Sequence, residues 1–303
     1  MRIAACLVLL LFLLPLPASA GELQIEHDGT TLNANLAGAE AGAEAVSDTD
    51  RLLLMVHGTR GHFGMDLLRN IQEGLAKRGI ASLAINLSLG VDDRHGIRKC
   101  EPAHDYTNAE ALAEMGAWIG WAKEQGVERL ALLGHSRGGN QVARYLAEEP
   151  AEAVRGAVLL APATWDEESV AAAFEQRFDT PLEKPLSRAQ AMAEEGYQDA
   201  WMNHVPFLYC PDARVKVASF LSYYGGDEAL DTPSILPDAK RPVKLMVGTE
   251  DENVPDLAER TETLPGNADV TRRVLEGAGH FFEGEYTEQV VVQTGEFLYR
   301  IGW

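Results

Sequence analysis

A serine stands between two glycines in the run Gly134-His135-Ser136-Arg137-Gly138, which matches the pattern Gly-x-Ser-x-Gly. A serine hydroxyl attacks a carbonyl carbon when a neighbouring base accepts its proton. Where such a serine lies on a sharp turn between a strand and a helix, side chains two positions away on either side would clash. Glycines at both positions therefore favour Ser136 as a nucleophile. The alternative is an ordinary glycine-rich turn.

An attacking serine needs a neutral imidazole as its base and an acid that orients this imidazole. Of the eight histidines, His280 stands at the end of the last predicted strand, in the letters GAGHFF. Asp251 ends the strand before it, in the letters VGTEDENVP. Its neighbours Glu250 and Glu252 are alternative acids, and so is Asp166, which follows an earlier strand. The other role open to Asp251 is to cap the next helix.

The remaining histidines are expected to pack inside the protein or to lie in loops: His27, His57, His62, His95, His104, His135 and His204. No two histidines have the His-x-x-x-His spacing of helical zinc sites. No pair of cysteines has the spacing Cys-x-x-Cys. The sequence therefore predicts no metal and no cofactor.

Apolar strands alternate with helices along most of the chain. Strands are predicted at 51–58, 80–87, 128–134, 154–162, 241–251 and 270–280, and helices at 65–79, 108–125, 138–149, 255–264 and 285–300. Such strands are buried on both faces, so the predicted fold class is α/β, with a doubly wound, mostly parallel sheet. The segment around Asp28-Gly29 alternates polar and apolar residues instead, which predicts a hairpin at an antiparallel edge.

The alternation is interrupted between residues 165 and 236, where helical stretches occur without a strong strand. We expect a single domain over 21–303 with a helical cap inserted at about 165–236. Ten of the chain's 22 aromatic residues fall in this segment. An aromatic-rich cap suits an apolar acyl or alkyl group of a substrate. The alternative is that these rings form the small core of the cap itself.

With these elements, the chain resembles the α/β-hydrolase fold family from about residue 21 to its end. The resemblance is carried by the letters MVHGTRG, GHSRGG, VGTEDENVP and GAGHFF. It implies a catalytic triad in which Ser136 attacks, His280 transfers the proton and Asp251 orients His280. It does not imply a substrate, because the fold supports many reactions.

The same resemblance implies two backbone N–H groups that stabilise the oxyanion of a tetrahedral intermediate. One belongs to Arg137, directly after the nucleophile, and the other to Thr59 in the letters HGTRG, with Arg60 as the alternative. The side chains of Arg60 and Arg137 either bind an acidic substrate or form ordinary ion pairs. In a protein this rich in acidic residues, ordinary ion pairs are the expectation.

Residues 1–20 have the layout of a secretory signal peptide. Arg2 precedes an apolar run of 14 residues at 3–16, and Ala18-Ser19-Ala20 is a small-residue cleavage pattern. Cleavage after Ala20 would leave 283 residues in a secreted or periplasmic protein. The run is shorter than the roughly 20 residues that span a bilayer, so no stable membrane insertion is expected. An uncleaved N-terminal anchor is the alternative.

The net charge of −20 excludes polyanionic partners such as nucleic acid. Beyond residue 20 the cysteines are Cys100 and Cys210. In an oxidising compartment they either form a disulfide or remain two separate buried thiols. A disulfide would tie the loop at 88–105 to the inserted segment.

The sequence thus predicts a serine hydrolase without a cofactor, acting on a small-molecule carboxylic ester through an acyl-enzyme. An amidase or peptidase and a thioesterase are alternatives on the same fold. From a different class, the alternative is a non-catalytic binding protein that retained the fold. The oligomeric state is left open.

Overall fold

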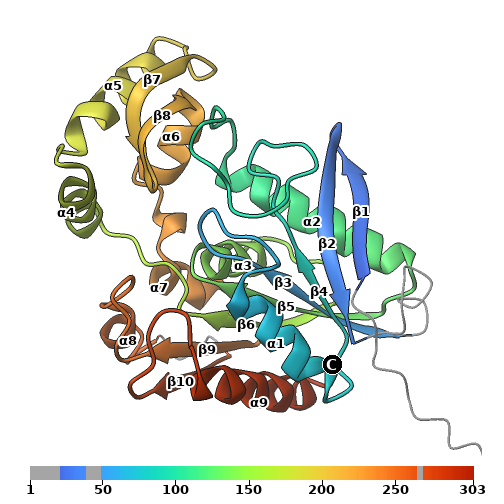
Figure 1. The fold of residues 1–303 in the computed structure, drawn as a ribbon. Coiled ribbons are helices and arrows are strands. Elements are labelled where there is room, and N and C mark those ends of the chain that lie inside the picture. Colours follow the sequence, from blue (N-terminus) through green and yellow to red (C-terminus); the bar gives the residue numbers. More distant parts are fainter. Residues whose placement is uncertain (1–20, 39–48, 265–268) are drawn as a thin grey trace, which may run out of the picture.

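The computed structural model describes residues 21–38, 49–264 and 269–303. The predicted signal peptide at 1–20 therefore lies outside the described residues. One eight-stranded sheet runs through the molecule in the order β1-β2-β4-β3-β5-β6-β9-β10 (Figure 1). Its strands are β1 Gly21–His27, β2 Thr30–Ala37, β3 Arg51–Val56, β4 Ser82–Ile85, β5 Arg129–His135, β6 Val154–Leu160, β9 Val243–Gly248 and β10 Val270–Leu275.

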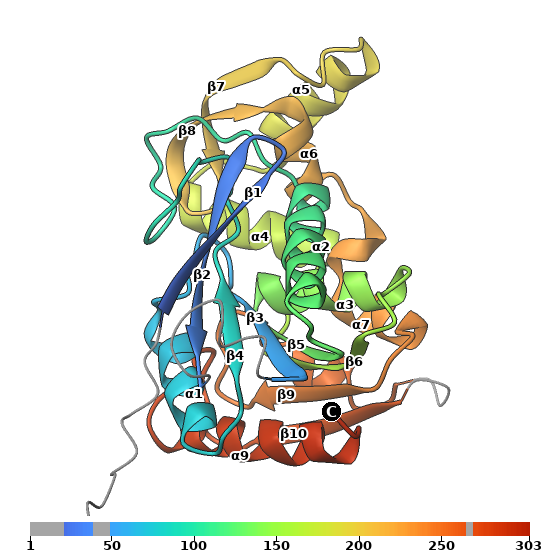
Figure 2. The ribbon, with the colours of Figure 1, turned by 90° about the vertical axis from the view of Figure 1, so that its right-hand side faces the viewer.

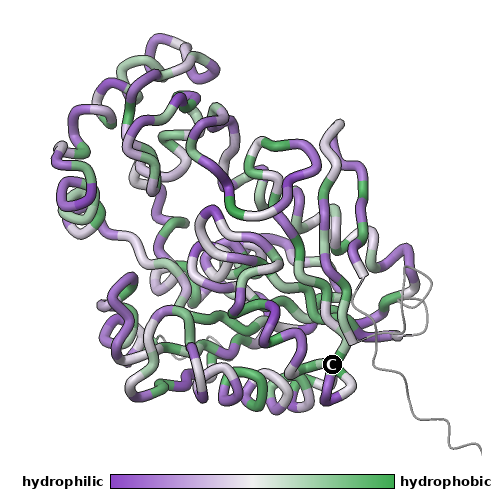
Figure 3. The backbone as a smooth tube through the Cα atoms, viewed as in Figure 1, coloured by the Kyte–Doolittle hydropathy of each residue, from purple (hydrophilic) through white to green (hydrophobic). Residues whose placement is uncertain are grey.

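All neighbouring strands from β4 to β10 pair in parallel. The hairpin β1–β2 is antiparallel, and β2 pairs with β4 in the antiparallel sense. The predicted fold class and the predicted antiparallel edge are therefore confirmed. In β3, every residue from Leu52 to Val56 has a fully buried side chain, which explains why its sequence does not alternate. Figure 3 shows hydrophobic residues gathered in these central strands.

The long helices cover both faces of the sheet. They are α1 Asp66–Ala76, α2 Asn108–Glu124, α3 Arg137–Ala147 and α9 Glu285–Arg300. Helices α1 and α9 lie on one face and α2 and α3 on the other (Figure 2). The predicted helix at 255–264 is a single turn, α8 Leu257–Arg260. The threonines at 261 and 263 lower the helix propensity beyond that turn.

The segment between β6 and β9 contains α4 Glu167–Phe178, α5 Glu183–Glu194, β7 Trp201–Phe207, β8 Cys210–Lys216, α6 Val217–Tyr224, α7 Thr232–Ile235 and two 3₁₀ turns, Glu228–Leu230 and Leu236–Asp238. Its part from α4 to α6 forms a lobe in the upper part of the molecule in both ribbon views, whereas α7 packs against α3 (Figures 1 and 2). We call residues 167–224 the lobe. The hairpin β7–β8 corrects the expectation of helices alone. Its pairing has two irregularities and Pro206 lies in β7, so the period-two pattern that reveals a strand is broken.

Most aromatic rings of the lobe pack against one another. The ring of Phe207 lies 5.5 Å from that of Tyr223 and 6.1 Å from those of Phe220 and Tyr224. The rings of Phe220 and Tyr224 are 4.9 Å apart. The cluster is therefore the core of the lobe, which is the alternative that the sequence left open.

Cys100 and Cys210 form a disulfide with a Cα–Cα distance of 5.4 Å. The hypothesis that a bond between them ties the loop after β4 to the lobe is confirmed. Backbone hydrogen bonds reinforce the tie, because the His104 N–H donates to the Arg214 carbonyl and the Lys216 N–H donates to the His104 carbonyl. The lobe is thus attached to the sheet domain through this loop as well as through its two chain connections.

Removing this disulfide should destabilise the protein. Cys100→Ser combined with Cys210→Ser is expected to lower the free energy of unfolding by about 2–4 kcal/mol, because the bond joins residues far apart in the chain and restricts the unfolded state. Guanidinium denaturation of the oxidised protein and the double variant measures the difference. The control is the reduced wild-type protein, which should match the double variant. Equal stability of the oxidised and reduced wild type would contradict the prediction.

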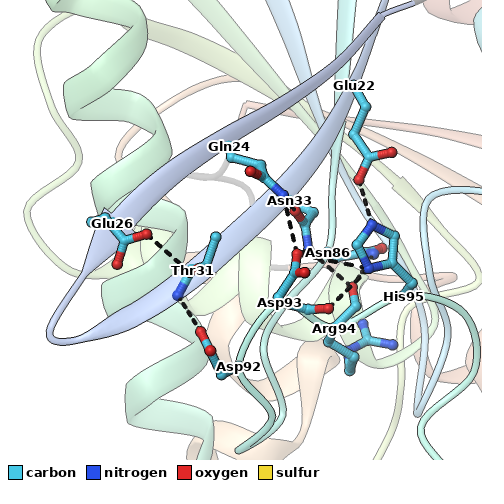
Figure 4. Close-up of polar contacts among 10 residues, drawn as sticks. All are labelled: Glu22, Gln24, Glu26, Thr31, Asn33, Asn86, Asp92, Asp93, Arg94 and His95. Atoms are coloured by element: carbon cyan, nitrogen blue, oxygen red, sulfur yellow. Dashed lines mark hydrogen bonds and ion pairs between the residues drawn. The ribbon is translucent and has the colours of Figure 1, made fainter.

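The loop after β4 is also held from the side of the hairpin β1–β2 (Figure 4). The Asp93 carboxylate accepts hydrogen bonds from Gln24, at 3.0 Å, and from Asn33, at 3.1 Å. His95 Nε2 lies 2.5 Å from a carboxylate oxygen of Glu22. The edge hairpin therefore holds residues 92–95, and Arg94 of this segment contacts His57, directly after β3.

Candidate active site

Ser136 lies on the predicted turn between a strand and a helix. It follows β5 directly and caps α3, with φ 54° and ψ −122°. This conformation is strained for a residue other than glycine, and the surrounding structure must hold it. Its backbone is held by β6 and by α3, because the Ser136 N–H donates to Leu160 and its carbonyl accepts from Asn140.

The glycines on either side are required by close contacts. A Cβ on Gly134 would lie 2.3 Å from the Gly138 carbonyl oxygen, and a Cβ on Gly138 would lie 2.4 Å from that of His57. The steric reason for the Gly-x-Ser-x-Gly spacing is therefore confirmed. A Cβ on Gly58 would lie 3.1 Å from the Ser136 Cβ, so the loop after β3 passes directly beside Ser136.

Gly138→Ala should be strongly destabilising. The new methyl group meets two backbone carbonyl groups that cannot move independently of β3, and such overpacking costs typically about 1–3 kcal/mol. The matched control is Gly120→Ala in α2, where a Cβ meets nothing within 4 Å. That control should keep or raise the free energy of unfolding, because alanine is the better helix former. Urea denaturation of both variants tests this, and a Gly138→Ala protein as stable as the wild type would contradict it.

Asp251 and His280 form a buried pair. The His280 Nδ1 and the Asp251 Oδ2 are 2.8 Å apart, and both side chains are buried. The other oxygen of Asp251 accepts the N–H groups of Asn253 and Val254, at 2.8 and 3.0 Å. Burial is the largest single effect on the Asp251 carboxyl and opposes its charged form. The hydrogen bond and charge of His280, together with the N–H groups of Val254 and Asn253, outweigh burial and lower the pKa of the carboxyl. Asp251 thus combines the two roles considered from the sequence, since it orients His280 and organises its own loop.

The alternative acids lie elsewhere. The Asp166 carboxylate accepts the Ser169 N–H at 2.9 Å and caps α4. Glu250 and Glu252 are exposed. Among the described residues, Asp251 is the one acid within ion-pair distance of His280.

His280 also lies beside the turn that carries Ser136. Its ring is 4.7 Å from the ring of His135, and its carbonyl oxygen is 2.9 Å from His135 Nε2. Burial lowers the pKa of His135 to about 3, so this neighbour is neutral. Within the described segments, no hydrogen bond joins the Ser136 hydroxyl to His280. Such contacts are often long before substrate binds.

Ser136, Thr59 and Arg137 line one pocket of about 520 Å³. A neighbouring pocket of about 340 Å³ opens beside His280, and Asn253 lines both. Arg137 is the first residue of α3, so its backbone N–H has no acceptor within the helix. The two residues predicted to stabilise an oxyanion are therefore brought next to Ser136.

His57 and Arg94 fix the loop that carries Thr59. The Leu87 N–H and Arg94 Nη2 both face His57 Nε2, at 3.2 and 3.0 Å, so this nitrogen accepts. The His57 Nδ1 therefore carries the proton and donates to the Gly58 carbonyl at 2.8 Å. Burial, followed by the charge of Arg94, lowers the pKa of His57 to about 3. The structural role predicted for His57 is confirmed.

The side chains of Arg60 and Arg137 differ from expectation. Arg60 Nε donates to the carbonyl oxygen of Arg98 at 2.7 Å. The guanidinium of Arg137 lies 5.6 Å from the Tyr223 ring, and its Nε and Nη1 are buried without a hydrogen-bond partner. Neither arginine forms an ion pair with a described residue, so the expectation of ordinary ion pairs is wrong. The lobe also adds Arg177 and Tyr209 to the pocket wall. Tyr209 is one of the ten aromatic residues of the predicted cap, whereas the sequence did not indicate Arg177.

Across residues 21–38, 49–264 and 269–303, no group of three or more His, Cys, Asp or Glu side chains is placed to hold a metal ion. No helix in these segments has the length and apolar character needed to span a membrane.

Comparisons with known proteins give the same fold. The model of a family described as the alpha/beta hydrolase family matches residues 53–293. Est1E from Butyrivibrio proteoclasticus is 19% identical over 93% of this chain and 98% of its own, with a TM-score of 0.62. An esterase from Pyrococcus furiosus, Pf2001, is 19% identical over 93% and 90%, with a TM-score of 0.57. The hydrolase GrgF from Penicillium sp. sh18 is 18% identical over 93% and 98%, with a TM-score of 0.63. No curated protein sequence matches significantly.

Proposed function

The chain belongs to the alpha/beta hydrolase family, and from this premise we propose that it is a serine hydrolase that cleaves carboxylic esters through an acyl-enzyme. The observation that carries the proposal is the buried hydrogen bond between His280 and Asp251, next to the strained turn of Ser136. An esterase among the proteins of similar structure supports the choice of an ester. Amides and thioesters remain the alternative substrates.

In the proposed mechanism, Asp251 sets the tautomer of His280. Because the carboxylate accepts a hydrogen bond from the Nδ1–H group, the proton stays on Nδ1 and the Nε2 of His280 is left as a base. It takes the proton of the Ser136 hydroxyl as the serine oxygen forms a bond to the ester carbonyl carbon. The N–H groups of Arg137 and Thr59 stabilise the oxyanion that forms on the carbonyl oxygen.

Collapse of this intermediate breaks the ester bond. The departing alcohol oxygen takes the proton from His280, and the acyl group stays on Ser136. A water molecule then gives its proton to His280 and attacks the acyl carbon, which releases the acid and restores the serine hydroxyl. Both half-reactions use the same base, and no cofactor enters either of them.

A fluorophosphonate probe tests the nucleophile. The native protein should be labelled, and peptide mapping should place the label on Ser136. A panel of p-nitrophenyl esters, the corresponding anilides and thioesters of equal acyl length then ranks the substrate classes. We expect the esters to be cleaved fastest. A protein that is folded but neither labelled nor active on any of the three classes would be a non-catalytic member of the family.

We also propose that the protein acts outside the cytoplasm, in the periplasm or as a secreted enzyme. The disulfide between Cys100 and Cys210 supports this, because such bonds persist mainly in oxidising compartments. Sequencing the N-terminus of the protein recovered from periplasm and culture medium tests both the location and cleavage after residue 20. Recovery only from the cytoplasm, with both thiols free, would contradict the proposal.

A further inference from the structure

We propose that the pocket beside Ser136 receives esters whose acyl part carries an anionic group, a carboxylate or a phosphate, which the side chain of Arg137 binds. The inference rests on the proposed function and narrows its substrate class. It concerns the side chain of Arg137, whereas the oxyanion role concerns only its backbone N–H.

The inference rests on the missing hydrogen-bond partners of the Arg137 guanidinium. Arg137 lines the pocket with Ser136, but its Nε and Nη1 are buried without a hydrogen-bond partner among the described residues. The contact that compensates for part of the burial is the stacking over the Tyr223 ring at 5.6 Å, which leaves the N–H donors unused. A guanidinium is charged at every physiological pH, so it cannot escape the cost of burial by losing its proton.

An unpaired buried charge is costly, and proteins usually pair it. Arg137 is partly buried as a whole, with its Nε and Nη1 buried, and Arg94 and Arg98 are almost completely buried. The last two follow that rule. Arg94 donates to the Leu87 carbonyl at 2.7 Å, and Arg98 donates to the Leu89 carbonyl at 2.9 Å. Arg137 differs from both, and it lines the pocket beside Ser136, from which a bound anion can supply an acceptor.

The rest of the pocket determines what can bind. Arg177 of the lobe lines the same pocket, with its guanidinium 4.3 Å from the Tyr209 ring. Glu252 is the acidic residue of the wall, and it is exposed at the rim. Two arginines against one glutamate give this pocket a positive excess in a chain whose net charge is −20. The negative net charge of the whole protein repels a small anion. The arginines of the pocket must therefore provide the attraction at short range.

Anionic and neutral esters of matched length test the inference. The substrates are p-nitrophenyl hemisuccinate and hemiglutarate, compared with p-nitrophenyl butyrate and valerate. We expect wild-type kcat/KM to favour the anionic member of each pair by at least about tenfold. Arg137→Met should lower that preference by about 10- to 100-fold, the range for one lost hydrogen bond to a charged group. The preference is a ratio, so a general loss of turnover in the variant does not affect it.

The matched control is Arg155→Met, which removes the same charge from an exposed position at the start of β6. Its preference should equal that of the wild type. Arg137→Lys should recover part of the preference, because lysine restores the charge without the planar fork of donors. Competitive inhibition by glutarate and by inorganic phosphate distinguishes the two kinds of anion, and Arg137→Met should weaken inhibition by whichever binds.

The outcomes separate this inference from the proposed function. If neutral esters are cleaved at Ser136 but the preference is absent, or is unchanged in Arg137→Met, the inference is wrong and the function stands. If no ester is cleaved, glutarate and phosphate binding to wild type and Arg137→Met by calorimetry still decides the role of the side chain. Equal binding, or none, by both proteins would overturn it.

Discussion

Ser136→Ala should lower kcat for a p-nitrophenyl ester by about 10⁵- to 10⁶-fold. Removal of the nucleophilic serine from a serine hydrolase lowers kcat by about this factor. The variant loses the atom that forms the acyl-enzyme, so the oxyanion donors and the pocket can contribute only a small residual rate. The loss should appear in kcat, with KM little changed, because the hydroxyl acts in the transition state rather than in ground-state binding.

Two controls make this result specific. Ser187→Ala, on an exposed position of α5, should keep wild-type kcat. Thermal unfolding should show that Ser136→Ala is folded. Serine and alanine both have a Cβ, so the positive φ at this position is equally strained for both, and the substitution removes no buried hydrogen bond. The fluorophosphonate label should be absent from Ser136→Ala and present on Ser187→Ala. Substantial esterase activity in the purified Ser136→Ala protein would show that the nucleophile lies elsewhere.

The part of the site that could be predicted from the sequence is local. The Gly-x-Ser-x-Gly spacing follows from atoms within a few residues of Ser136, and the glycine contacts at 2.3 and 2.4 Å show why. The central strands could be predicted because burial on both faces leaves an uninterrupted apolar run. The start and end of α9 agree with the predicted 285–300 for a similar reason, since its polar and apolar residues follow the helical period.

The part that could not be predicted depends on contacts between distant segments. The hairpin β7–β8 has no clear alternation, because its irregular pairing and Pro206 change which residues face the lobe core. Arg177 and Tyr209 join the pocket only because the lobe folds over Ser136. The unpaired guanidinium of Arg137 is of the same kind. In the folded chain this guanidinium lies against the ring of Tyr223, which is distant in the sequence, and its Nε and Nη1 have no hydrogen-bond partner among the described residues.

The contacts that hold the pocket in place also come from segments far apart in the sequence. The loop at 86–107 is bonded to the lobe by the disulfide, and the edge hairpin holds residues 92–95 of that loop. Arg94 of this loop then reaches His57 and orients the segment that carries Thr59. The loop therefore couples the attachment of the lobe to the position of a proposed oxyanion donor.

Asp251→Asn is the second large effect that we expect, a loss of about 10⁴-fold in kcat with little change in fold. The asparagine can keep one oxygen on the N–H groups of Asn253 and Val254, so its amide NH₂ must face the Nδ1 of His280. An amide N–H at that position is a donor and cannot accept a hydrogen bond from the Nδ1–H of the ring. His280 is then driven to the tautomer that carries its proton on Nε2, and that nitrogen can no longer accept the proton of Ser136.

Steady-state kinetics on a p-nitrophenyl ester measures this loss, and the matched control is Glu250→Gln, which removes one negative charge from the adjacent residue. Glu250 is exposed, so this control should keep nearly all of the activity. Because Asp251→Asn preserves the loop hydrogen bonds, its thermal unfolding should stay close to that of the wild type, which separates a tautomer effect from a folding defect. If Asp251→Asn were active while Asp166→Asn were not, the acid of the triad would be the one that follows β6, and the buried pair with His280 would be structural.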